Sequence, residues 1–125
     1  MASETLHEDA NKMGPAVVDR HRAIVSLMEE LEAVDWYDQR VAATDDPTLK
    51  AILAHNRDEE KEHASMLLEW LRRHDEVLSG HLKTYLFTTG EITGIEAVAE
   101  GKAAGAAAGG GGDGSLGIGR TRNVE

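Results

Sequence analysis

Two glutamates and a histidine occur where two expected helices should be apolar. Glu60 and His63 form a Glu-x-x-His motif, whose three-residue spacing places both side chains on one face of a helix. The other residues on that face are mainly apolar: Leu49, Ile52, Asn56, Leu67 and Trp70. Glu30 occurs in an earlier segment, at the border of a second apolar stripe, and Tyr37 follows it two turns later.

Carboxylates on an inward face need a physical reason. Burying them without compensation is costly, and a divalent or trivalent metal ion would offset that cost. Carboxylate oxygen and neutral imidazole are the donors that suit iron or manganese. The Glu-x-x-His motif by itself is common by chance on solvated helices, but opposite an interior glutamate it is more specific. The pattern therefore predicts a metal centre formed by Glu30, Glu60 and His63.

The number of ligands predicts a partner. A carboxylate-bridged di-metal bundle uses a Glu from each of two helices and a Glu-x-x-His from each of two others. This chain supplies one of each. Two copies related by a twofold axis would supply the full set, and isologous dimers are the commonest small assemblies. We therefore predict a site on the axis of a homodimer, with neither chain competent alone.

The residues around these ligands have the periodicity of long helices. The first is expected from about residue 16 to about residue 43, with apolar residues at three- and four-residue steps: Val17, Ile24, Leu27, Leu31, Val34 and Val41. Asp46 is a good N-cap and Pro47 fits the first turn of a second helix that runs to about His74. Each helix would be about 40 Å long, and the short linker forces an antiparallel hairpin. A third, shorter helix fits residues 75–88.

Composition bounds the class of protein. The chain has 125 residues, enough for one small domain; 29% are charged and 4% aromatic, which favours an all-α fold with solvated helices. A formal net charge of −10 argues against nucleic acid as a partner, and it either attracts a cation or simply maintains solubility. Without cysteine there is no thiolate site. No apolar run is long enough to span a membrane, so we expect a soluble, cytosolic protein.

Four segments are expected along the chain. Residues 1–14 would be a flexible polar arm without the features of a signal peptide, and residues 15–98 a helical domain. Residues 99–114 are rich in Gly and Ala, a composition typical of a flexible linker. Residues 115–122 restore two aliphatic side chains beyond that linker. They could be a docking peptide or a tail without a role.

Long blocks of the sequence resemble the encapsulated ferritins. They are Arg20–Ser26, Met28–Arg40 and Ala54–Ala64, and the similarity continues in Trp70–Arg73 and Thr84–Phe87. The resemblance as a whole covers about residues 18–98. The resemblance implies a two-helix subunit that dimerises into a ferritin-like four-helix bundle, with the dimers forming a ring of ten chains.

The resemblance also implies roles for particular residues. The iron ligands would be Glu30, Glu60 and His63, with two irons per dimer and Tyr37 close by. The site through which metal enters would correspond to Glu29, Glu32 and Trp36. From the residues alone, these two glutamates fit either a ring that guides cations or an ordinary solvated face.

A partner is implied by the end of the chain. Encapsulated ferritins end in a peptide that binds the inside of an encapsulin shell and resembles Leu-Gly-Ile-Gly-Ser-Leu. Leu116–Gly119 fits that peptide, whereas Arg120 and Thr121 replace its last two residues. The resemblance therefore implies an encapsulin nanocompartment in the bacterial cytoplasm as the location.

The implied activity is a ferroxidase that oxidises Fe(II) to Fe(III) with dioxygen or peroxide. Three alternatives remain: a structural helical dimer with a polar layer, a metal-binding dimer without turnover, and a di-metal oxygenase, for which so short a chain offers little pocket. His55, Glu59 and Glu62 form another possible face, which we interpret as surface. His7 and Glu8 are interpreted as part of the polar arm.

Overall fold

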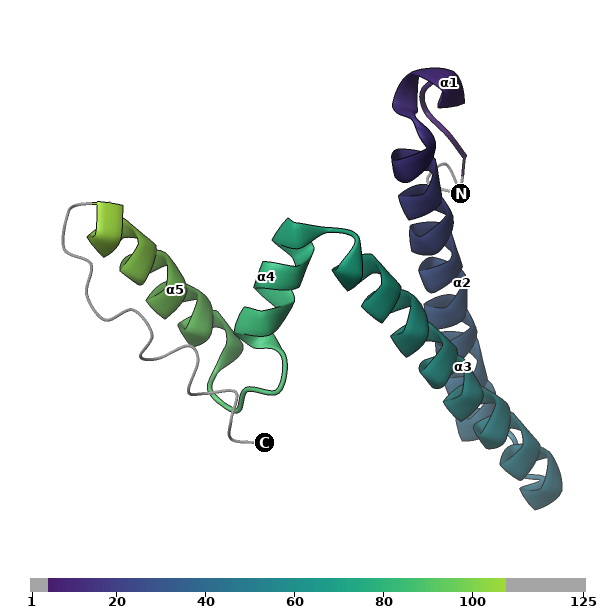
Figure 1. Cartoon of the computed structure of the whole chain (residues 1–125). Coiled ribbons are helices and arrows are strands. Elements are labelled where there is room, and N and C mark those ends of the chain that lie inside the picture. Colours follow the sequence, from purple (N-terminus) through teal and green to yellow (C-terminus); the bar gives the residue numbers. More distant parts are fainter. Residues whose placement is uncertain (1–4, 108–125) are drawn as a thin grey trace. The chain divides into compact units, whose positions relative to one another are not determined.

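The structure is a computed structural model that describes residues 5–107, with side chains described as far as residue 101 (Figure 1). In that part every regular element is a helix: α1 (Ala10–Met13), α2 (Pro15–Ala43), α3 (Pro47–Arg73), α4 (Glu76–Tyr85) and α5 (Ile92–Ala107). The chain divides into two units, one ending at His74 and the other beginning at Asp75. The expected all-α fold is confirmed, and each unit has its own packing.

The first unit is an antiparallel hairpin of α2 and α3, which lie side by side in Figure 1. Three residues, 44–46, separate the two helices. Asp46 caps α3, since its carboxylate accepts hydrogen bonds from the N–H groups of Thr48 at 2.9 Å and Leu49 at 3.2 Å. Pro47 occupies the first turn, where its missing N–H costs nothing. The predicted hairpin is therefore present, with boundaries within one or two residues of those expected.

The segment before the hairpin differs from the expected polar arm. Asp9 caps a single helical turn, α1, by accepting from the N–H of Asn11 at 2.9 Å. Gly14 then adopts a φ of +88°, a conformation that glycine reaches without a Cβ penalty, and Pro15 begins α2. The short helix was not expected because a four-residue element is too brief to show periodicity.

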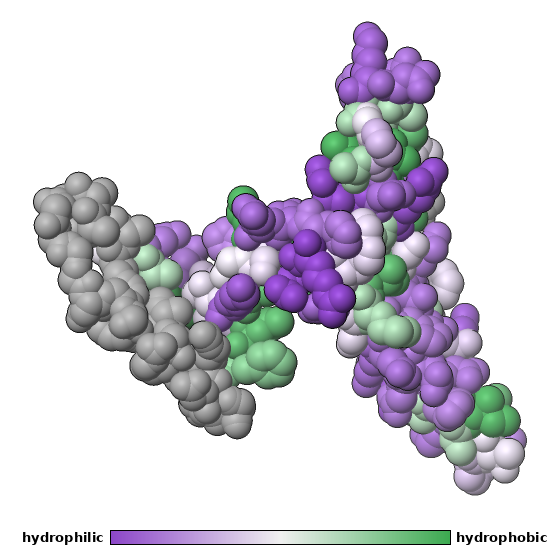
Figure 2. All heavy atoms as spheres, in the orientation of Figure 1, coloured by the Kyte–Doolittle hydropathy of each residue, from purple (hydrophilic) through white to green (hydrophobic). Residues whose placement is uncertain are grey.

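The hairpin has little interior of its own. Among its described residues only Ala23, Ala64 and Leu71 are buried. Large apolar side chains remain open to solvent instead, including Ile52, which is 53% exposed, and Met66, which is 59% exposed. Figure 2 shows apolar groups lying open among the charged ones on the hairpin surface. Exposed apolar area on this scale is typical of a chain that buries it against a partner.

The C-terminal end of α3 carries a cluster of ion pairs around Glu69. Both oxygens of Glu69 accept from Arg72, each at 2.8 Å, and Arg73 donates to Glu69 Oε2 at 2.7 Å. Hydrogen bonds from Arg72, then from Arg73, lower the pKa of Glu69 to about 2. These cations also lie in the last turn of the helix, where they complement its dipole.

The Glu69 group predicts a pH-dependent contribution to stability. A depressed pKa in the folded state stabilises the protein above the unfolded value of about 4.3, and the contribution is lost as pH falls towards 2. Glu69→Gln should therefore unfold at a lower urea concentration than wild type at pH 6, by a small margin because the pairs are exposed. The margin should shrink at pH 3. A margin that stays constant with pH would contradict the assignment.

The second unit contains α4 and α5. Asp75 caps α4 through the N–H of Leu78 at 2.9 Å, and α4 ends at Tyr85, sooner than the expected residue 88. Among the side chains of this unit that the structure describes, Ile95 is the buried apolar one. The helix α5 continues to Ala107, so the linker expected from residue 99 is helical over its first part. Alanine is the strongest helix former, which explains the difference.

None of the described helices is both long enough and apolar enough to cross a membrane.

Candidate metal centre

Glu30 on α2 meets Glu60 and His63 on α3. One ligand atom from each of the three lies within 4.8 Å of the others. His63 Nδ1 is 3.3 Å from Glu60 Oε1 and 3.6 Å from Glu30 Oε1. Among the described residues no other group of three His, Asp or Glu side chains approaches this closely. The structure thus brings together the three residues that the sequence pattern predicts as ligands.

Helix geometry accounts for this arrangement. Glu60 and His63 are three residues apart, so their side chains project from one face of α3. The antiparallel hairpin then places Glu30 opposite them. The cluster is half-buried: the side chain of Glu30 is 26% exposed, that of Glu60 25% and that of His63 42%. It therefore opens onto the surface of the chain.

The carboxyl groups of Glu30 and Glu60 shift each other's pKa in opposite directions. A hydrogen bond to Glu60 raises the pKa of Glu30 above its ordinary value, and burial and the charge of Glu60 add to this, while His63 opposes it. The same hydrogen bond lowers the pKa of Glu60. Burial pulls the pKa of His63 down, but the nearby carboxylates, Glu60 first, prevail and raise it. A cation that binds these groups would compete with protons for them.

Glu59, predicted as part of a surface face, is exposed and also lies beside this cluster. Its Oε1 is 4.0 Å from His63 Nε2, and its Oε2 is 4.0 Å from His55 Nε2. The signal was the four-residue spacing from His55 to Glu59 and from Glu59 to His63, which places all three on one side of α3. Glu62, the other member of the face interpreted as surface, is exposed on the same helix.

The remaining predicted site residues lie on α2, outside the group of three. Glu29, Glu32 and Trp36 are exposed, and Tyr37 is half-buried. The guanidinium of Arg40 lies over the rings of Trp36, at 5.9 Å, and of Tyr37, at 5.7 Å.

A shallow hollow of about 230 Å³ adjoins these rings. It is lined by Trp36, Gln39 and Arg40, and none of the three clustered residues borders it. The hollow is therefore no pocket for an organic substrate beside the cluster. Farther towards the N-terminus, His7 and Glu8 lie on the exposed segment before α1, outside the cluster.

The donor set defines the chemistry available. Two carboxylates and one imidazole are hard to borderline donors, which suit a first-row metal ion such as iron or manganese. Three residues leave coordination positions open, and the surface location leaves room for donors from elsewhere. The cluster therefore offers the donor set of a first-row metal site and leaves room for further ligands.

Comparison with known proteins shows the family to which the chain belongs. The EncFtn-like family model matches residues 5–89. The chain is 63% identical, over 94% of its length and 88% of the relative's, to the encapsulated ferritin-like protein of Rhodospirillum rubrum. It is 48% identical to a ferritin-like protein of Thermotoga maritima over 93% of its length and 96% of the relative's. A shorter match, 39% identical over 47% of this chain and 45% of the relative, is to the encapsulin nanocompartment cargo protein EncC of Myxococcus xanthus.

A solved structure agrees. The crystal structure of a protein from Nitrosomonas europaea superimposes with a TM-score of 0.67 at 60% sequence identity, covering 70% of this chain and 96% of that one. The family match and the structural match agree with each other. This chain belongs to the EncFtn-like family of encapsulated ferritin-like proteins.

Proposed function

We propose that this protein is a ferroxidase, which oxidises Fe(II) to Fe(III) at a di-iron centre shared by two copies of the chain. The observation that carries the proposal is the gathering of Glu30, Glu60 and His63 within 4.8 Å on an open face of the hairpin. Membership in a family of encapsulated ferritin-like proteins supports iron as the metal.

The donors favour oxidation. Carboxylate oxygens are hard ligands that stabilise the ferric product more than the ferrous substrate, so they lower the cost of removing an electron. Two ferrous ions supply the two electrons that reduce dioxygen to hydrogen peroxide, or peroxide to water, with protons taken from solvent. Glu30 and Glu60 would hold the irons through their carboxylates, and His63 would complete each half as a neutral imidazole.

The second half of the centre comes from a second chain. Ile52 and Met66 lie on the same side of α3 as His63 and are exposed in the single chain. A twofold partner would cover these apolar groups and add its own Glu, Glu and His, which gives two irons per dimer and a four-helix bundle. The dimers would then assemble into a ring of ten chains, as the family resemblance implies.

Residues on α2 would serve access to the centre. The exposed carboxylates of Glu29 and Glu32, next to Trp36, would draw ferrous ions from solvent, since an acidic surface raises the local concentration of cations. Tyr37 would lie close to the irons. None of these four residues belongs to the group of three ligands.

Oxidised iron would be stored inside an encapsulin shell. The names of the relatives from Rhodospirillum rubrum and Myxococcus xanthus describe encapsulated or cargo proteins, and this chain would share that location. The peptide Leu116–Gly119, by which it would bind the shell, lies outside the described residues.

Oxidation kinetics test the proposal. Metal-free protein is loaded with ferrous iron without oxygen and then mixed with air-saturated buffer or with peroxide, and ferric absorbance is followed. We expect the protein to accelerate oxidation over the same iron in buffer, through repeated turnovers. Iron binding with no acceleration would favour the non-catalytic metal-binding dimer. No binding at all would favour the structural dimer.

A further inference from the structure

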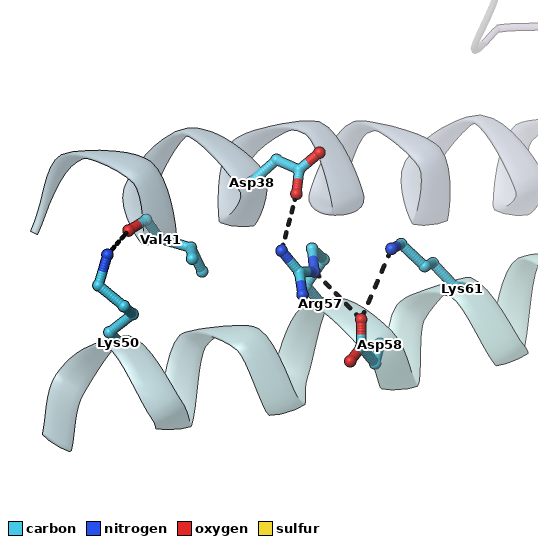
Figure 3. Close-up of polar contacts among 6 residues, drawn as sticks. All are labelled: Asp38, Val41, Lys50, Arg57, Asp58 and Lys61. Atoms are coloured by element: carbon cyan, nitrogen blue, oxygen red, sulfur yellow. Dashed lines mark hydrogen bonds and ion pairs between the residues drawn. The ribbon is translucent and has the colours of Figure 1, made fainter. Parts of the chain in front are cut away.

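Polar contacts tie α2 to α3 at successive levels of the hairpin. Nearest the linker, Lys50 Nζ donates to the carbonyl of Val41 at 2.7 Å. Farther along, Arg57 Nη1 donates to Asp38 Oδ1 at 3.0 Å (Figure 3). Beyond that level lies the metal centre itself, where His63 meets the α2 carboxylate. The Asp38–Arg57 pair is therefore the contact between the linker and the ligands.

Arg57 is held from two sides. Its Nε donates to Asp58 Oδ1 at 3.1 Å while its Nη1 reaches across to Asp38, and Lys61 lies 3.6 Å from the same Asp58 oxygen. Figure 3 shows the guanidinium pointing from α3 towards α2 between these carboxylates. The side chain of Arg57 is 22% exposed, less than either of its partners. A planar guanidinium can serve two carboxylates at once in fixed directions, which a lysine cannot do.

The linker alone cannot fix the geometry at the metal centre. From Ala43 to Glu30 the chain rises about 20 Å along α2, so a small change in the angle between the helices is magnified there. The hairpin interior offers little resistance to such a change in angle. Among its described residues, only Ala23, Ala64 and Leu71 are buried. Asp38 lies about 12 Å from Glu30 along α2, and Arg57 is three residues from Glu60.

We propose that Asp38 and Arg57 are positioning residues of the metal centre, whose ion pair sets the separation of α2 and α3 and so brings Glu30 opposite Glu60 and His63. They act through the helices and touch no metal. The inference deepens the proposed function and rests on it for the metal. Exposed ion pairs contribute little to overall stability, so losing this one should alter the centre more than the fold.

Cobalt(II) binding tests the inference. Cobalt(II) is not oxidised in the air-saturated buffer of the iron assay, and its absorption spectrum reports ligand geometry. Asp38→Asn should bind cobalt about fivefold more weakly than wild type, with a changed ligand-field spectrum. Asp38→Glu keeps the carboxylate and should restore both. Asp19→Asn is the matched control, since it removes the same charge from a 2.8 Å pair with Arg22 that lies within α2.

A double-mutant cycle assigns the effect to the pair. Asp38→Asn combined with Arg57→Gln should bind cobalt no more weakly than the worse single variant, because each change breaks the same contact. Additive losses, wild-type affinity in Asp38→Asn, or an equal loss in Asp19→Asn would overturn the inference.

A metal-free measurement separates this inference from the proposed function. The imidazole ¹⁵N shifts of His63 report its contact with Glu30, at 3.6 Å in the structure. These ¹⁵N shifts should change in Asp38→Asn and keep their wild-type values in Asp19→Asn. Unchanged shifts in Asp38→Asn would overturn the positioning role even if wild type is a ferroxidase. Moved shifts in a protein that oxidises no iron would leave the positioning role standing and remove the proposed activity.

Discussion

Replacement of Glu30 by alanine is expected to slow iron oxidation at least about 100-fold, because each dimer loses both of the carboxylates that α2 contributes. The fold should survive the change. Glu60 faces Glu30 and raises its pKa, so removal of one carboxyl relieves a charge conflict in the metal-free protein. The measurement is the initial rate of ferric absorbance after air is admitted, with circular dichroism to check helix content.

Glu62→Ala is the matched control for this change. Glu62 is an exposed glutamate on the same helix as Glu60, but two residues away and thus on a different face. The control should oxidise iron at nearly the wild-type rate. A folded Glu30→Ala protein with the wild-type rate would remove the ferroxidase proposal, and equal losses in both variants would point to general acidity instead of a defined centre.

Replacement of Ile52 by glutamate should abolish oxidation without touching any ligand. In a dimer closed over His63, this side chain would be covered by the partner, and a buried unpaired carboxylate there would oppose association. The hairpin itself should persist, because Ile52 is already 53% exposed in the single chain. We expect a monomer in analytical ultracentrifugation whose oxidation rate equals that of iron in buffer.

Ala51→Glu tests whether position or charge is responsible. Ala51 is exposed and precedes Ile52 on α3, so its side chain projects about 100° around the helix from that of Ile52. The Ala51→Glu substitution should leave both dimer association and iron oxidation at wild-type levels. An active monomeric Ile52→Glu protein would show that a single chain is sufficient and would contradict the shared centre.

Much of this fold follows from local sequence signals. The helix boundary at Asp46–Pro47 follows from capping chemistry, which operates over a few residues and is visible in the chain. The cluster of Glu30, Glu60 and His63 follows from polar residues that interrupt apolar stripes, since a hairpin must turn those stripes towards each other.

Other features depend on which partners a side chain contacts, and the periodicity of the sequence does not predict this. Arg57 has three acidic neighbours within three residues on α3, and only the three-dimensional structure shows that it reaches across to Asp38 as well as to Asp58. Glu59 is predicted as surface and is exposed, but only the structure shows that it approaches both His55 and His63. The division after His74 escaped prediction, since the third helix has the same periodicity as the first two.

The small number of buried residues in the hairpin bears on the concentration at which the protein is active. If each centre needs two chains, the active fraction follows mass action and rises with concentration. Chains that are scattered after synthesis would be largely inactive, and chains confined together in a shell would be driven into active pairs. Packaging would then act as the switch, so that ferric iron forms where there is a compartment to receive it.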